Sequence, residues 1–276
     1  VPRAVTSRAF NPLAVQGPMA RTVADCALFL DAMAGWHQGD PLSLPDPPTP
    51  FARLAAEPRA PKRVGFSVDL GYAAIDPEVA DICAAAVRRF AEAGAEVDAI
   101  DLDLSETPDI YSVLYPMSVL GDRQQYVHEH RDRAFSGLVA SVDNAEKFTV
   151  EDIVRAERGR GRLFLKAAAA FERCDVIVTP TLGTAPFSIE ERSPGKPLAD
   201  SLEFDFPWIA ACCATVLIGA PVIAIPAGFT RDGRPVGLQI AGKPRDEAGI
   251  IQAAAVLEEI LGLHRQLPVD PREGRS

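Results

Sequence analysis

Serine and lysine side chains are the first candidates for chemistry in this chain, because a serine hydroxyl attacks a carbonyl carbon once a base removes its proton. Ser193 and Lys196 match the S-x-x-K pattern. They lie in a Pro/Gly-rich stretch rather than at the start of a helix. The Ser-Asp-Asn and Lys-Thr-Gly partners are absent, and so is a G-x-S-x-G elbow. We therefore interpret this segment as a solvated loop and assign no catalytic residue.

Histidines and cysteines give no pattern typical of a metal site. His128 and His130 flank Glu129, and two ligands at i and i+2 project to different faces of a helix. The five cysteines include no C-x-x-C pair. Cys212 and Cys213 are adjacent in an apolar run, so we interpret them as small core residues. The sequence thus predicts no bound metal.

Charge and hydropathy exclude two classes of partner. The formal net charge is -10, and the densest basic stretch, residues 155–166, is interleaved with Glu157 and apolar residues. A direct nucleic-acid partner is therefore not expected. No run of about eighteen apolar residues could span a bilayer, so no membrane partner is expected either. The small and odd number of cysteines favours a reducing cytoplasm over a disulfide-bonded fold. Assembly into a homo-oligomer is a possible partnership that the sequence does not decide.

Helical and strand patterns alternate along the chain. Thr22 and Asp25 form a capping-box pattern before the first helix, and Thr149 and Asp152 repeat it later. The periodicity predicts helices at 23–34, 76–93, 149–171, 208–217 and 246–261, and strands at 63–66, 97–104, 176–178, 222–225 and 236–240. Strand–helix–strand order predicts an α/β fold.

Turn and breaker residues define the connections. Asp232-Gly233 predicts a hairpin between the last two strands, and Pro226 predicts a bulge or strand end. The proline-rich residues 40–50 and 183–207 are expected to be a surface connection and a long loop. Helical spacing within 107–147 leaves the element boundaries there uncertain.

Three sequence blocks then carry a family resemblance. They are Gly-Pro-Met-Ala-Arg-Thr-Val-Ala-Asp at 17–25, Cys-Asp-Val-Ile-Val-Thr-Pro-Thr at 174–181, and a longer block at 219–240 that includes Gly-Ala-Pro-Val-Ile-Ala-Ile-Pro-Ala-Gly-Phe. In this order and spacing they resemble the C-terminal half of amidase-signature enzymes. The resemblance extends over nearly the whole chain, from residue 1 to the final helix.

The resemblance implies an amide hydrolase that uses no cofactor. In that family a Ser–Ser–Lys set performs the reaction and lies upstream of the first block. No Gly-Ser-Ser or Gly-Gly-Ser run occurs in the 276 residues. We therefore expect residues 1–276 to be the C-terminal portion of a single amidase-signature domain. The expected fold is an incomplete amidase-signature fold, a mixed β-sheet flanked by helices.

The resemblance also locates candidate substrate-binding residues. It places Thr181 near the substrate channel, together with the stretch from Thr215 through Ile218 to Gly219. Trp208 is a candidate for lining an acyl pocket. Ligands of open α/β sheets gather beyond the carboxyl ends of strands, which fits Thr181.

Three hypotheses follow for the function. The first is the C-terminal portion of an amidase, inactive until the N-terminal half is supplied and a small amide can bind. The second is the amidase subunit of a tRNA-dependent amidotransferase, which works in a complex. The third is a non-catalytic pseudoenzyme or interaction module.

If neighbouring strands are missing, the 176–178 and 222–225 strands are expected to present bare edges or apolar faces. The isolated chain is then expected to be poorly soluble.

Overall fold

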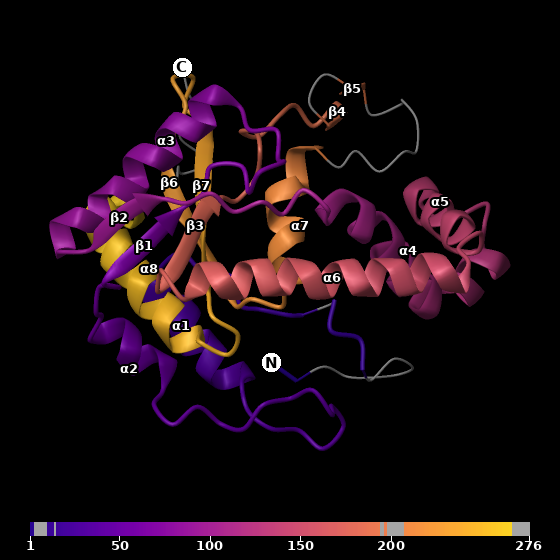
Figure 1. The fold of residues 1–276 in the computed structure, drawn as a ribbon, viewed down its shortest axis with the longest axis horizontal. Helices are drawn as coiled ribbons and strands as arrows, with labels where there is room; N and C mark the ends of the chain where they lie inside the picture. The colour runs from indigo at the N-terminus through magenta and orange to yellow at the C-terminus, as the bar shows by residue number, and fades with distance from the viewer. Residues whose placement is uncertain (3–9, 14, 194–195, 198–206, 267–276) are drawn as a thin grey trace, which may run out of the picture.

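A mixed five-stranded β-sheet forms the centre of the computed structural model, which describes residues 1–2, 10–13, 15–193, 196–197 and 207–266 (Figure 1). Its strands, in the order β2-β1-β3-β7-β6, are β2 Glu96–Ala99, β1 Arg63–Phe66, β3 Val176–Pro180, β7 Pro235–Gly242 and β6 Val222–Phe229. β1 runs parallel to β2 and β3, whereas β7 is antiparallel to both β3 and β6. The predicted mixed α/β fold is confirmed.

Helices cover both faces of the sheet. On one face pack α1 Val23–Met33, α2 Phe51–Ala56, α3 Pro77–Arg88 and α8 Glu247–Leu261; on the other pack α4 Thr107–Glu129, α6 Val150–Phe171 and α7 Ala210–Leu217. Successive strand residues alternate between the two cores, as with Val178 and Ile177 in β3. The sheet therefore separates two apolar layers.

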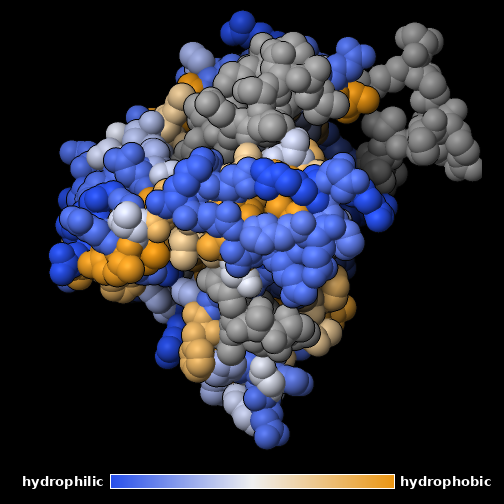
Figure 2. All heavy atoms as spheres, turned by 90° about the vertical axis from the view of Figure 1, so that its right-hand side faces the viewer, coloured by the Kyte–Doolittle hydropathy of each residue, from blue (hydrophilic) through white to orange (hydrophobic). Residues whose placement is uncertain are grey.

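One helix lies away from the sheet. α5 Ser136–Ala145 packs on the far end of α4, at the right of Figure 1. Seen from that end, the surface is mainly hydrophilic with smaller apolar groups between (Figure 2). The outer side of α6 exposes four large apolar side chains, Val150, Val154, Phe164 and Leu165. None of the helices in the described ranges has the length and hydropathy to cross a bilayer.

Local capping chemistry sets most helix ends where the sequence predicts them. The Thr22 hydroxyl accepts a hydrogen bond from Asp25 N at 3.0 Å. Thr149 and Asp152 form a reciprocal capping box at the start of α6. Gly262 ends α8 with a left-handed φ of 67°, a conformation that costs glycine little.

Three short elements complete the helical part. They are the 3₁₀ turns η1 Arg89–Ala93, η2 Pro207–Ile209 and η3 Leu263–Arg265. The predicted helix at 208–217 is thus divided between η2 and α7.

The expected loop at 183–207 contains a small hairpin, β4 Glu191–Ser193 with β5 Lys196–Pro197. Two stretches of that predicted loop, 194–195 and 198–206, lie outside the described residues.

The strand predicted at 97–104 is wrong in extent. β2 covers only Glu96–Ala99, because its neighbour β1 has four residues to pair with it. Leu102 and Leu104 still alternate inward, 5% and 1% exposed, without belonging to the ladder. The short helix α2 has no predicted counterpart. The helical spacing found within 107–147 belongs to α4, a single 23-residue helix that contains Pro116, and the sequence does not predict its bounds.

The expectation of bare edges is half right. β6 lies at the edge of the sheet, as expected for residues 222–225. The expectation is wrong for residues 176–178, because β3 pairs with β1 on one side and β7 on the other and all its residues are buried. The β6–β7 hairpin is confirmed, and its register shifts between Pro226 and Gly228, the bulge that Pro226 predicts.

Removing the α6 cap should destabilise the fold. Thr149→Ala deletes a hydroxyl that accepts from Asp152 N at 3.2 Å, and such a loss costs about 1 kcal/mol. Urea unfolding measures the free energy of unfolding. Ser112→Ala, which removes an exposed hydroxyl within α4, is the control and should change stability little. Equal effects of the two variants would contradict the role of the cap.

The same cap predicts a pH dependence. Hydrogen bonds from Thr149, then one from Arg155, lower the pKa of Asp152 to about 2. The pKa of Asp152 in the folded protein is thus lower than its value of ~3.9 in the unfolded chain. The charged carboxylate therefore stabilises the fold above pH ~3.9, and this stabilisation is lost as the pH falls towards the folded pKa. The free energy of unfolding of the wild type should exceed that of Asp152→Asn by a constant amount near neutral pH. This difference should become smaller as the pH falls from the unfolded pKa towards the folded pKa. A gap independent of pH would contradict this assignment.

Candidate functional site

The carboxyl end of β3 holds the first candidate residue. Thr181 N donates to Gly237 O at 3.0 Å, so the chain stays beside β7 after β3 ends. The hydroxyl oxygens of Thr179 and Thr181 are buried without a hydrogen-bond partner among the described residues. Thr179 faces Gln239 directly across the β3–β7 pair. Neither Thr179 nor Gln239 is among the residues predicted from the sequence, although Thr179 belongs to the same block as Thr181.

Gln239 fastens α7 to this part of the sheet. Its side chain is 2% exposed, and its Nε2 donates to Ala211 O at 3.2 Å. The Tyr72 hydroxyl donates to the neighbouring Ala210 O. Burial raises the pKa of Tyr72, which keeps this hydroxyl protonated as a donor. Two side chains, Gln239 of β7 and Tyr72 of the turn after β1, therefore fix the first turn of α7.

The segment after β3 is tied to the turn before α7. Gly183 N donates to Trp208 O at 2.8 Å, and Asp76 N donates to Gly183 O at 2.7 Å. Gly183 thus joins η2 to the start of α3. Through this contact Thr181 and Trp208 come to the same end of α7.

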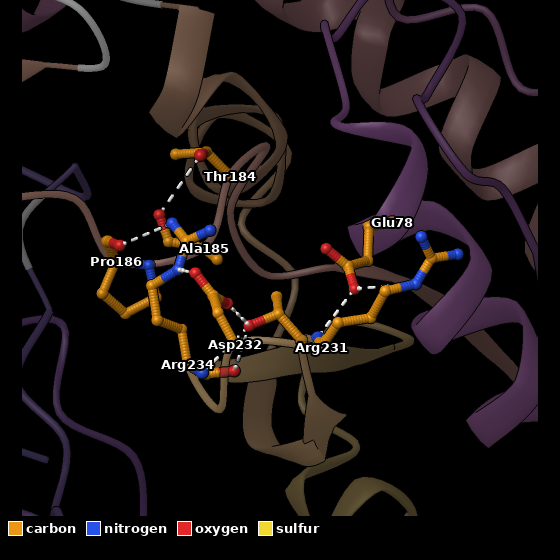
Figure 3. Close-up of polar contacts among 8 residues, drawn as sticks. Glu78, Thr184, Ala185, Pro186, Arg231, Asp232 and Arg234 are labelled. Carbon is orange, nitrogen blue, oxygen red and sulfur yellow. Dashed lines mark hydrogen bonds and ion pairs between the residues drawn. The ribbon is translucent and has the colours of Figure 1, made fainter.

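The β6–β7 hairpin holds the same segment from its other side (Figure 3). Arg234 Nη1 donates to Pro186 O at 3.0 Å, and its Nε donates to Asp232 Oδ2 at 2.8 Å. Arg231 N donates to Glu78 Oε1 at 2.8 Å, which links the hairpin to α3. Because Asp232 holds the guanidinium in place, residues 183–187 are anchored at both ends.

Arg160 fixes the opposite end of α7. Its Nε donates to Leu217 O at 2.8 Å, and its side chain is 18% exposed. A cation at a helix C-terminus also interacts favourably with the helix dipole. The chain then turns at Gly219, whose φ of 64° suits glycine. Arg160 is not predicted from the sequence, because no local pattern connects it with Leu217.

Four of the five predicted substrate-binding residues lie in two groups, one at each end of α7. Thr181 and Trp208 lie near the start of α7, whereas Ile218 and Gly219 follow its end. At 1.5 Å per residue the helical path from 208 to 219 is roughly 16 Å. Thr215 lies between, with its hydroxyl donating to Cys212 O at 2.8 Å. Ile218 is 7% exposed and packs in the core between the sheet and α6. Substrate binding by all five residues stays a prediction.

Other sequence motifs have structural contacts. His128 Nε2 lies 2.9 Å from Glu146 Oε1, and the His130 ring packs edge-on against Tyr126. Within the described residues no group of three or more His, Cys, Asp or Glu could hold a metal ion. Cys213 is 2% exposed, as expected of a small core residue, whereas Cys212 is only half-buried.

Comparisons with known proteins match most of the chain. The family model described as Amidase matches residues 1–251. An acylamidase of Rhodococcus erythropolis is 32% identical over 279 residues, which covers 98% of this chain and 57% of that protein. A glutamyl-tRNA(Gln) amidotransferase subunit of Sphingopyxis alaskensis is 30% identical, covering 89% of this chain and 54% of its own.

The fold is also found in solved structures. A bacterial aryl acylamidase of the amidase-signature enzymes superposes with a TM-score of 0.78 at 25% identity, covering 98% of this chain and 59% of that one. The chain spans a little over half the length of the relatives that it matches.

The anchoring role of Arg160 is testable. Arg160→Gln removes a charged donor from Leu217 O, so we expect a loss of about 1.5–3 kcal/mol in the free energy of unfolding. Hydrogen exchange at the Gly219 and Ala220 amides, which bond to Val216 O and Thr215 O, should accelerate. Arg158→Gln, at an exposed position of the same helix, is the control. Unchanged exchange in Arg160→Gln would contradict the anchoring role.

Proposed function

The chain belongs to the amidase family, and from this premise we propose that it is the C-terminal portion of an amide hydrolase. The reaction of such an enzyme converts a carboxylic amide to an acid and ammonia or an amine. In this proposal residues 1–276 form part of one domain, because a single sheet carries both helical layers. A small amide binds once the N-terminal half is supplied.

One observation carries the proposal. The family match at 1–251 includes all three motif blocks, yet the 276 residues contain no Gly-Ser-Ser or Gly-Gly-Ser run to supply an activated serine. The chain then provides substrate-facing residues and not the nucleophile. We assign Thr181, Trp208, Thr215, Ile218 and Gly219 to that substrate-facing part. Residues at the ends of α7 are well placed for this, because side-chain hydrogen bonds from β7, from α6 and from the turn at Tyr72 fix that helix.

A second candidate function is the amidase subunit of a tRNA-dependent amidotransferase. Several relatives at about the same identity are named as glutamyl-tRNA(Gln) amidotransferase subunits, including those of Chromobacterium violaceum and Heliobacterium modesticaldum at 31%. This function requires a companion subunit. Recovery of one stoichiometric companion with the tagged protein from its native host would favour it over a lone hydrolase, and recovery of the protein by itself would favour the hydrolase.

The purified 276-residue chain should not hydrolyse amides. We expect release of aniline from acetanilide at the rate of a buffer blank, because the chain lacks the serine-rich run of the family. The Rhodococcus erythropolis acylamidase serves as the positive control, and circular dichroism establishes that the chain is folded. Release in proportion to the concentration of the chain, well above the blank, would contradict the proposal.

A further inference from the structure

Two adjacent cysteines lie near the start of α7. All five cysteines of the chain are free thiols, and Cys212 and Cys213 are the two that are neighbours in sequence. Cys212 is half-buried, whereas Cys213 is 2% exposed. As a neutral thiol, Cys212 donates to Ile209 O at 3.0 Å. A thiol that solvent can reach is thus followed directly by a buried one.

The two thiols differ in acidity because they contact each other. A hydrogen bond from the Cys213 thiol lowers the pKa of Cys212, and the backbone N–H of Cys212 lowers it further, although burial opposes both. The first turn of α7, which includes Cys212, is also where the positive end of the helix dipole favours a thiolate. The same hydrogen bond and burial raise the pKa of Cys213. Cys212 is therefore the thiol that ionises, and Cys213 stays protonated beside it.

Contacts from two other elements surround the pair. The Tyr111 hydroxyl of α4 is hydrogen-bonded to the Cys213 sulfur. On the side of the sheet, Gln239 Nε2 donates to Ala211 O at 3.2 Å. This carbonyl belongs to the peptide group that directly precedes Cys212. A chemical change at the two thiols therefore acts on the contact that fixes α7 to the sheet.

We propose that Cys212 and Cys213 form a redox-active pair, which a peroxide oxidises to a disulfide between adjacent residues. The Cys212 sulfur attacks one oxygen of hydrogen peroxide and breaks the O–O bond, which gives a sulfenic acid and one water. The Cys213 thiol then displaces the oxygen of the sulfenic acid as a second water and closes the S–S bond. Two thiols thus lose two electrons and two protons, and hydrogen peroxide becomes two waters. This chemistry is independent of the serine chemistry of amide hydrolysis.

The disulfide changes the start of α7. Consecutive Cα atoms are about 3.8 Å apart across a trans peptide, whereas bridged cysteines usually have Cα atoms roughly 4.4–6.8 Å apart. The bridge therefore distorts the peptide group between the two cysteines, and this strain makes it easy to reduce. Gln239 and Thr215 bind the carbonyls of Ala211 and Cys212, so both contacts are disturbed. Oxidation thus loosens the first turn of α7 reversibly.

A count of free thiols on the 276-residue chain tests the proposal. The reduced protein is treated with hydrogen peroxide, unfolded, labelled with N-ethylmaleimide and weighed by intact-mass measurement. We expect three of the five thiols to be labelled after peroxide and all five after dithiothreitol. Peptide mass measurement should locate the loss in one peptide that contains both Cys212 and Cys213. Hydrogen exchange at the amides of residues 214–216 should accelerate in the oxidised protein.

Three substitutions and rates separate the pair from the other cysteines. Cys26 is the matched control, because it is half-buried like Cys212 but burial, and then Glu258, raise its pKa. Iodoacetamide at pH ~7 should alkylate Cys212 at least ~tenfold faster than Cys26, since each unit of pKa changes the thiolate fraction about tenfold. Cys26→Ser should still lose two thiols to peroxide, whereas Cys212→Ser should lose none. Cys213→Ser should add oxygen to Cys212, because its sulfenic acid has no neighbouring thiol.

Three results would overturn the inference. They are retention of all five labels after peroxide, a loss of two thiols that persists in Cys212→Ser, and equal alkylation rates for Cys26 and Cys212 in the folded protein. A bridge between two copies of the chain, seen as a doubled mass, would also contradict it. Circular dichroism establishes that each variant is folded. None of these measurements uses an amide, so their failure would leave the proposed amide hydrolase standing.

Discussion

The buried hydrogen bond from Gln239 to the carbonyl of Ala211 is the contact on which the position of α7 depends. The buried residues of α7 include several small ones: Ala210 and Ala211 pack against Ala73, and Ala214 lies in the core between the sheet and α6. Small side chains let the helix approach closely but give its position little definition, so a polar contact is needed to fix it. Loss of this contact would leave a buried polar group without a partner, which costs about 1–3 kcal/mol. The candidate residues at both ends of α7 inherit their positions from this constraint.

The remaining anchors act on the two ends of the same helix. At its start Gly183 and Tyr72 bind the main chain around Trp208, and at its end Arg160 binds Leu217. The β6–β7 hairpin steadies residues 183–187 from outside through Arg234. A rigid frame of strands, with loops attached at several points, is the arrangement in which binding residues are held precisely enough to discriminate among ligands.

Sequence reasoning predicts the parts of this fold that local chemistry decides. Thr22, Thr149 and Gly262 set helix ends through contacts within a few residues, and Asp232-Gly233 sets the hairpin. The extent of β2 depends instead on the length of β1, which alternation in residues 97–104 cannot reveal. Arg160 and Leu217 are 57 residues apart, and Gln239 and Ala211 are 28 apart. No periodic or capping pattern connects such pairs, so the residues that position the candidate site become visible only in the folded structure.

The central claim is that this chain shapes part of an amidase substrate site and supplies no activated nucleophile. A fluorophosphonate probe followed by intact-mass measurement tests it most directly, because such probes react with a serine only when its hydroxyl is activated. The account predicts no added mass on the folded 276-residue chain, while the full-length Rhodococcus erythropolis acylamidase serves as the reference protein. One stoichiometric adduct on a serine of this chain would contradict the account and place catalytic chemistry within these residues.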